Sequence, residues 1–179
     1  MGTLTTPRII AVTGPRPEHA GTLDLAAVEA FVAYAKAEGW ELNTGGAAGY
    51  DLLVAQVASR LDVFYLVVQP HQGFILAQWE RHPHRAPCAP TPDGRRGIRH
   101  LYERWQGGCE FERNGVLIEG RASLNVPPAT ALVAFWPLHD RKRRGGGTRY
   151  TIGLARKAGI PVWDGLAWPE EPMRLLLAV

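Results

Sequence analysis

The sequence has only two cysteines, and it contains no apolar run of the roughly 20 residues that a membrane-spanning helix requires. A lone pair of cysteines in a chain of this size is more simply two reduced thiols than a disulfide framework, so we expect Cys88 and Cys109 to be free. The first residues also lack a charged segment followed by an apolar stretch, which is the pattern of a secretory signal. From these absences we expect a cytoplasmic protein with no membrane partner.

Standard metal-binding spacings are missing as well. The side chains of His82, His84, Cys88 and Cys109 are chemically able to bind zinc, but their spacing matches no standard zinc pattern. We therefore expect no metal and no bound cofactor.

The overall composition is that of an ordinary globular domain, with 46% hydrophobic and 21% charged residues among 179. The formal net charge of +3 is unevenly distributed. Six arginines and three histidines lie between Arg81 and Arg104, against Asp93 and Glu103 alone, and a second basic run at 141–144 precedes a glycine-rich turn. This distribution favours an anionic ligand, without establishing that the ligand is a nucleic acid.

Short apolar runs alternate with segments of helical spacing along the chain. The pattern predicts strands at 8–13, 40–44, 63–68, 131–136 and 160–163, and helices between Asp24 and Gly39 and at 51–60, 112–119 and 148–158. Regularity is lost over 69–111, apart from a short helix predicted at 98–105, and this irregular basic insertion is either a binding segment or disordered. The alternation predicts one α/β domain over residues 1–179, a Rossmann-like, doubly wound, mostly parallel sheet with helices on both faces.

Two glycine-rich turns each follow a predicted strand and open a predicted helix. The first contains Gly45, Gly46 and Gly49, and the second is formed by residues 145–147. Backbone N–H groups at a helix N-terminus attract anions, and glycine lets the backbone approach a phosphate closely. In a doubly wound sheet both turns lie at the carboxyl ends of the strands, beside the loop that begins at Gly14. We therefore expect a phosphate-binding crevice at this edge, although neither turn matches a P-loop or the GxGxxG fingerprint, which disfavours metal-assisted phosphoryl transfer.

The candidate ligand-binding residues are the turns and the polar side chains predicted near them: Gly14, Arg16, Gly45, Gly46, Gly49, Asp51, Arg113, Asn114, Gly145, Gly146, Gly147 and Thr148. Arginine is suited to a bidentate phosphate contact. Each candidate also has a structural interpretation, because the glycines would serve tight turns, Asp51 and Thr148 would cap helices, and the arginines would be solvated. Trp79 and Trp105 would likewise either pack internally or stack on a base.

The order of these motifs resembles the SLOG superfamily, which includes the lysine-decarboxylase-like LOG proteins and the DNA-processing protein A family. The resemblance is carried by residues 13–16, 44–51 and 112–114, the apolar strand to Trp136, and residues 145–148, and it spans about Arg8 to Trp163 apart from the insertion. It implies a Rossmann-like fold, a homodimer, and a nucleotide or nucleotide-derived ligand bound across the two glycine turns.

The match to LOG phosphoribohydrolases is incomplete. These enzymes cleave nucleoside monophosphates and carry Pro-Gly-Gly-x-Gly-Thr-x-x-Glu with an upstream Glu-Arg. Glu112-Arg113 matches the upstream pair and Gly147-Thr148 matches the Gly-Thr, but Thr151 stands at the position of the catalytic Glu, and residues 143–144 replace the Pro-Gly. Glycosidic cleavage would then require another acid, such as Asp51 or Asp140, so no catalytic residue is assigned.

Three functions stay open from the sequence. The leading hypothesis is a nucleotide- or nucleotide-derivative-binding sensor of the SLOG type, with or without phosphoribohydrolase-like activity. The alternative is a single-stranded DNA-binding module resembling DNA-processing protein A, motivated by Trp79, Tyr102 and Trp105 within the basic insertion. The third is a scaffold whose glycine turns are purely structural.

Overall fold

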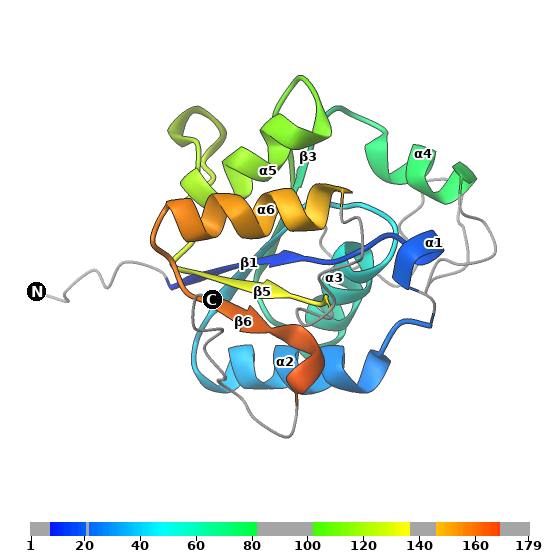
Figure 1. Cartoon of the computed structure of the whole chain (residues 1–179), viewed down its shortest axis with the longest axis vertical. Helices are drawn as coiled ribbons and strands as arrows, with labels where there is room; N and C mark the ends of the chain where they lie inside the picture. The colour runs from blue at the N-terminus through cyan, green and yellow to red at the C-terminus, as the bar shows by residue number, and fades with distance from the viewer. Residues whose placement is uncertain (1–7, 21, 82–101, 137–145, 169–179) are drawn as a thin grey trace, which may run out of the picture.

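A six-stranded parallel sheet forms the centre of the molecule, and helices cover both of its faces (Figure 1). The computed structural model describes residues 8–20, 22–81, 102–136 and 146–168. Within these ranges, none of the helices is long and apolar enough to cross a membrane.

The strand order in the sheet is β4-β3-β2-β1-β5-β6, and all five pairings are parallel. The strands are β1 (Ile9–Thr13), β2 (Glu41–Thr44), β3 (Tyr65–Gln69), β4 (Glu103–Trp105), β5 (Ala131–Ala134) and β6 (Val162–Asp164). Strand β1 is central because it pairs with β2 on one side and β5 on the other. The direction of winding reverses between β1 and β5, which is the point where doubly wound sheets bind ligands. The predicted Rossmann-like fold is confirmed.

The two faces of the sheet are covered by different helix pairs. Helices α2 (Leu25–Ala37) and α3 (Tyr50–Leu61) pack on one face, and α5 (Glu110–Glu119) and α6 (Gly146–Lys157) on the other. Alternate residues of β1 enter the two cores, since Val12 belongs to the α2–α3 side and Ala11 to the α5–α6 side. Burial on both faces explains why the strands read as continuous apolar runs in the sequence.

Local signals in the sequence set the ends of α2. The Asp24 side chain accepts a hydrogen bond of 2.9 Å from the N–H of Ala27, which caps the helix N-terminus. Gly39 follows the helix with φ +68°, a left-handed conformation that glycine adopts at little cost. The predicted helix between these two residues is therefore confirmed.

Among its described residues, the region predicted to be irregular contains a helix and a strand that were not predicted. Helix α4 (Phe74–Arg81) follows β3, and β4 pairs with β3 at the edge of the sheet in the register Val67↔Glu103. The predicted helix at 98–105 is wrong over its described end, because residues 103–105 form β4. The Tyr102 ring packs at 4.9 Å from the Phe64 ring, and such tertiary pairing overrides local helix preference.

Some short elements of the structure were not predicted, and some residues singled out in the sequence lie outside the described residues. The additional elements are α1 (Pro17–Ala20) and the 3-10 turns η1 (Ala122–Leu124) and η2 (Gly165–Ala167). The basic residues at 82–101 and 141–144, the candidate Gly145, and Asp140 lie outside the described ranges.

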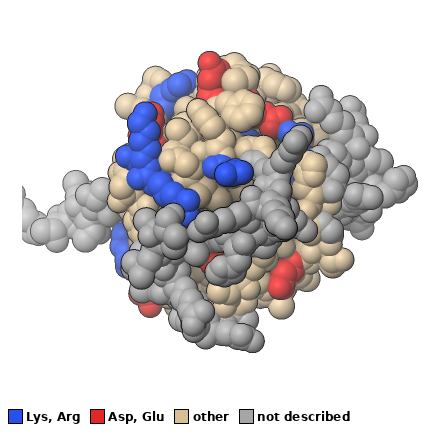
Figure 2. Space-filling view, in the orientation of Figure 1, with Lys and Arg blue, Asp and Glu red and all other residues tan. Residues whose placement is uncertain are grey.

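In the view of Figure 2, the described Lys and Arg side chains gather mainly over α6, whose last turn contains Arg156 and Lys157. These two charges lie at the opposite end of α6 from the glycine turn and favourably face the negative end of the helix dipole.

Candidate functional site

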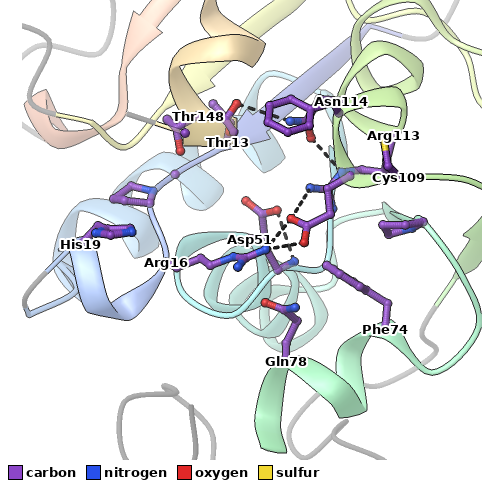
Figure 3. Close-up of a pocket in the computed structure, with 18 of the residues that line it drawn as sticks. Thr13, Arg16, His19, Asp51, Phe74, Gln78, Cys109, Arg113, Asn114 and Thr148 are labelled. Carbon is purple, nitrogen blue, oxygen red and sulfur yellow. Dashed lines mark hydrogen bonds and ion pairs between the residues drawn. The ribbon is translucent and has the colours of Figure 1, made fainter. Parts of the chain in front are cut away.

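A cavity of about 580 Å³ lies at the carboxyl ends of the central strands (Figure 3). Thr13 at the end of β1 and Trp136 after β5 both line it, so it includes the point where the winding of the sheet reverses. The other walls come from the loop after β1, the start of α3, one side of α4 and the first turns of α5 and α6. The size and position are those of a small-molecule site.

The second glycine turn forms one wall through Gly146, Gly147 and Thr148 at the start of α6. The first N–H groups of an α-helix have no acceptor within the helix, so this end of α6 offers donors to an anion. Asn114 on α5 donates a hydrogen bond of 3.4 Å to the carbonyl oxygen of Gly147, and the Thr151 hydroxyl donates one of 2.8 Å to the same oxygen. Asn114 and Thr151 thus hold the turn in place through one carbonyl oxygen. Thr151 is fully buried, and its hydroxyl is hydrogen-bonded within α6.

Arg16 extends into the cavity from the loop after β1 and pairs with Glu110 at the start of α5. Its Nη2 atom lies 2.5 Å from each carboxylate oxygen of Glu110, and the two side chains are 27% and 36% exposed. Glu110 also lies 3.9 Å from Nη2 of Arg113. One carboxylate therefore occupies the space between two guanidinium groups on the cavity wall.

Arg113 is only 4% exposed, although it carries a charge. Its Nη1 donates to the carbonyl oxygen of Gly45, and its Nε donates a hydrogen bond of 2.8 Å to Oδ1 of Asn114. Burial lowers the pKa of Arg113, and the charges of Asp51 and Glu110 oppose that shift. Because its hydrogen bonds go to the protein, Arg113 acts mainly to hold the first glycine turn against α5.

Asp51 lies in the first turn of α3 and is 5% exposed. Its Oδ2 accepts a hydrogen bond of 3.4 Å from the N–H of Ala47. Burial raises the pKa of Asp51 to about 6, against the opposing effects of Arg113, the backbone N–H groups of Ala47 and Gly45, and Arg16. A carboxyl group with a pKa in this range changes its charge state near neutral pH.

The cavity brings together eight of the twelve predicted site residues: Gly14, Arg16, Asp51, Arg113, Asn114, Gly146, Gly147 and Thr148. Gly45, Gly46 and Gly49 do not line it, and Gly145 lies outside the described residues. Gly46 and Gly49 have φ values of +69° and +103°, and an added Cβ would lie 2.8 Å from Val67 Cγ1 and 2.6 Å from the carbonyl oxygen of Pro15, respectively. The tight turn requires glycine at both positions for its own packing, and their contact with a phosphate stays a prediction.

Sequence reasoning missed several cavity residues, above all Gln78 and Glu110. Others are Thr13, His19, His71, Phe74, Phe111 and Trp136, together with Cys109, a free and exposed thiol. Gln78 lies on α4, a helix that was not predicted, and Glu110 lies two residues before the predicted start of α5. The acidic residues at the start of α5 were the available signal, since carboxylates are favoured at helix N-termini.

No group of three His, Cys, Asp or Glu side chains that could hold a metal ion occurs among the described residues. His82, His84 and Cys88 lie outside them. The cavity offers the N-terminus of α6, the partly exposed guanidinium group of Arg16 and the buried carboxyl group of Asp51, an arrangement suited to binding a small anion with polar substituents.

No protein-family model and no curated protein matches this sequence. The fold is similar to that of the molybdenum cofactor binding protein from Rippkaea orientalis, with 20% identity, a TM-score of 0.56 and coverage of 89% of this chain and 76% of that one. The Moco carrier protein from Chlamydomonas reinhardtii has 20% identity, a TM-score of 0.52 and the same coverage. DNA processing protein A from Helicobacter pylori has 17% identity, a TM-score of 0.52 and coverage of 89% of this chain and 65% of that one.

These similarities confirm the expected resemblance to SLOG proteins at the level of the fold. The expected resemblance named the DNA-processing protein A family, and the solved structure of DNA processing protein A shares the fold of this chain. At such identities, a shared fold says nothing by itself about a shared ligand.

Proposed function

We propose that this chain binds a nucleotide or nucleotide derivative in the cavity, with its phosphate at the start of α6. The observation that carries the proposal is the meeting of two anion-binding elements in one cavity. The glycine turn at Gly146–Thr148 offers backbone donors, and Arg16 approaches from the loop after β1. A helix N-terminus together with an arginine is a common way of holding phosphate.

The charges around the cavity determine how a phosphate would bind. Arg16 and Arg113 are balanced by Asp51 and Glu110, so these four side chains contribute no net charge when all are ionised. Arg113 already donates to Gly45 and Asn114. The phosphate would therefore use the α6 N–H groups and compete with Glu110 for Arg16, whose pairing is partly exposed and correspondingly weak.

The remaining walls suit an organic group attached to the phosphate. Phe74, Phe111 and Trp136 contribute aromatic surface, and a volume of about 580 Å³ falls within the range of small-molecule pockets. Two neighbours in fold are described as a molybdenum cofactor binding protein and a Moco carrier protein, which supports use of this fold to hold a small ligand. A sensing role, with or without phosphoribohydrolase-like activity, a cytoplasmic location and a homodimer are further parts of the proposal.

Single-stranded DNA binding is the second candidate, because two aromatic side chains are exposed near the edge strand β4. Tyr102 and Trp105 are 42% and 45% exposed, and exposed aromatic rings provide stacking surfaces for bases. The similarity in fold to DNA processing protein A, whose solved structure concerns single-stranded DNA binding, supports this candidate.

A thermal-shift screen would test both candidates. The panel contains nucleoside mono-, di- and triphosphates, dinucleotides, ADP-ribose derivatives and short oligonucleotides. A ligand at about 100 times its Kd should stabilise the chain by about 2.7 kcal/mol. Gly147→Asp places a carboxylate at the phosphate position and should abolish the shift, because an added Cβ there lies 3.3 Å from Asn114 in the cavity wall.

Gly153→Asp is the matched control, since it adds the same charge to the same helix at an exposed position where the new Cβ would face open space. A shift with mononucleotides in the wild type and in Gly153→Asp alone would support the proposal and justify product analysis for hydrolysis. Shifts with oligonucleotides only, weakened by salt and by Trp105→Ala, would favour DNA binding instead. No shift with any compound would contradict both candidates.

A further inference from the structure

Within the part of the chain that the structure describes, two buried side-chain oxygen atoms on the cavity wall have no hydrogen-bond partner: Oδ1 of Asp51 and Oε1 of Gln78. Asp51 is 5% exposed and Gln78 is 1% exposed. Buried polar atoms in folded proteins are almost always hydrogen-bonded, because leaving one without a partner is costly. Two such atoms in one cavity indicate that the cavity is built to accept hydrogen bonds there.

These two residues come from different elements that converge on the cavity. Asp51 is fixed at the start of α3 by its bond from Ala47, which leaves its second oxygen unused. Gln78 lies one turn after Phe74 on α4, and Phe74, Ala77 and Gln78 present one side of that helix to the cavity. Figure 3 shows the Asp51 and Gln78 side chains on either side of Arg16, both directed toward the interior of the site.

We propose that Asp51 and Gln78 form a hydroxyl-binding subsite, which receives neighbouring sugar hydroxyls of the ligand whose phosphate lies at α6. The inference rests on the proposed function. It restricts the expected ligands to phosphorylated compounds that also carry several hydroxyl groups, such as those of a ribose. The subsite is distinct from the phosphate position, because α3 and α4 supply it and α6 does not.

The surrounding charges favour a neutral donor over a cation. The Arg113 and Arg16 charges act on Asp51, as their effect on its pKa shows, and they would repel an ammonium group or a metal ion placed beside it. The Gln78 side chain also favours a hydroxyl as the bound group, because an amide presents either an acceptor or a donor according to its orientation. A hydroxyl both donates and accepts, so one sugar hydroxyl satisfies the amide in either orientation, and a second hydroxyl donates to the carboxylate.

Calorimetric titration with matched nucleotides tests the subsite. The probes are the four ribonucleoside 5′-monophosphates, their 2′,3′-dideoxy counterparts and inorganic phosphate. In the wild type, at least one ribonucleotide should bind at least about tenfold more tightly than its dideoxy counterpart, the range expected for a hydrogen bond to a charged group. In Gln78→Leu this ratio should fall to about twofold or less, while the affinity for inorganic phosphate is unchanged because the variant alters no charge. In Asp51→Asn the ratio should fall as well.

Gln72→Leu is the matched control, because Gln72 is exposed, precedes α4 and does not line the cavity. It should keep the wild-type ratio. If Asp51→Asn does not fold, Gln78→Leu decides the question alone. Equal binding of each nucleotide pair, or a ratio that survives in Gln78→Leu, would overturn the subsite and leave the phosphate site standing. Absence of binding by all nucleotides and by phosphate would overturn the proposed function, and the subsite with it.

Discussion

The buried guanidinium group of Arg113 lies against the backbone of Gly45 and donates a hydrogen bond to its carbonyl oxygen. The two residues are 68 positions apart in the sequence, so this contact ties the first glycine turn to α5. An added Cβ at Gly45 would lie 2.5 Å from Arg113 Nη1 and 2.7 Å from Asp51 Oδ2. The absence of a side chain at Gly45 is therefore what lets the two charged groups approach the same stretch of backbone.

Gly45→Ala should lower the free energy of unfolding by roughly 1–3 kcal/mol, the usual cost of overpacking a buried site. The measurement is denaturant unfolding monitored by circular dichroism. Gly153→Ala is the control, since it adds the same methyl group to an exposed helix position with open space and should be neutral or stabilise by up to about 1 kcal/mol. Equal stability of Gly45→Ala and the wild type would mean that Arg113 moves away from the turn without cost.

The sheet was predictable because its strands carry their signal locally. The β1 residues 9–13 are all buried, and a run of apolar residues between two helix layers is recognisable without knowledge of its neighbours. Strand β4 has no such signal, since only β3 flanks it in the sheet and its burial is partial. Its conformation depends on pairing with β3, a long-range contact that local sequence does not reveal.

The candidate site likewise contains residues that could be predicted from the sequence and residues that could not. The glycine turns were found because glycine at a strand-to-helix junction has few explanations, and the structure places Gly147 on the cavity wall. It also shows that Gly46 and Gly49 are needed for the packing of their own turn, which the sequence could not separate from ligand contact. Gln78 was missed because no helix was predicted at 74–81, and its burial results from the packing of α4 beside the cavity, a long-range arrangement that local sequence does not reveal.

The pH dependence of stability should reveal the buried carboxyl of Asp51. Burial raises its pKa from 3.8 to about 6, so between these values the folded chain holds a proton that the unfolded chain has released. The stability that this proton provides is fully present below about pH 4 and is lost as the pH rises through 6. Relative to Asp51→Asn, the wild type should lose on the order of 2–3 kcal/mol of unfolding free energy between pH 4 and pH 7.

The measurement is urea unfolding of both proteins at several pH values and constant ionic strength. Subtracting the Asp51→Asn curve removes the titration of the other carboxyl groups, because they are common to both proteins. Parallel curves across this pH range would show that Asp51 titrates normally and is better solvated than its position implies.

Glu110→Gln should strengthen the binding of inorganic phosphate and of nucleotides by roughly two- to fivefold. The wild-type carboxylate holds Arg16 and adds negative charge beside the proposed phosphate position, so it competes with an incoming anion. The gain corresponds to the usual energy of a partly exposed ion pair. Calorimetric titration at low and high salt provides the measurement, and the difference should shrink as salt screens the charges.

Glu119→Gln is the control for Glu110→Gln, because it makes the same change at the exposed far end of α5. It should leave the affinity unchanged. A weaker affinity in Glu110→Gln would show that Glu110 supports the ligand site, contrary to its assigned role as a competitor.

Arg113→Met should destabilise the chain by about 3–5 kcal/mol, because it removes the donor to Gly45 and leaves Asp51 buried without its main counter-charge. Much of this cost comes from the stranded carboxylate, so neutralising Asp51 should recover part of it. We expect the double variant Arg113→Met/Asp51→Asn to be at least about 1 kcal/mol more stable than the sum of the two single changes implies. A double-mutant cycle at pH 7, measured by denaturant unfolding, gives this coupling. Additive effects would mean that the two charges do not interact across the first glycine turn, and that Arg113 acts through its hydrogen bonds to Gly45 and Asn114 alone.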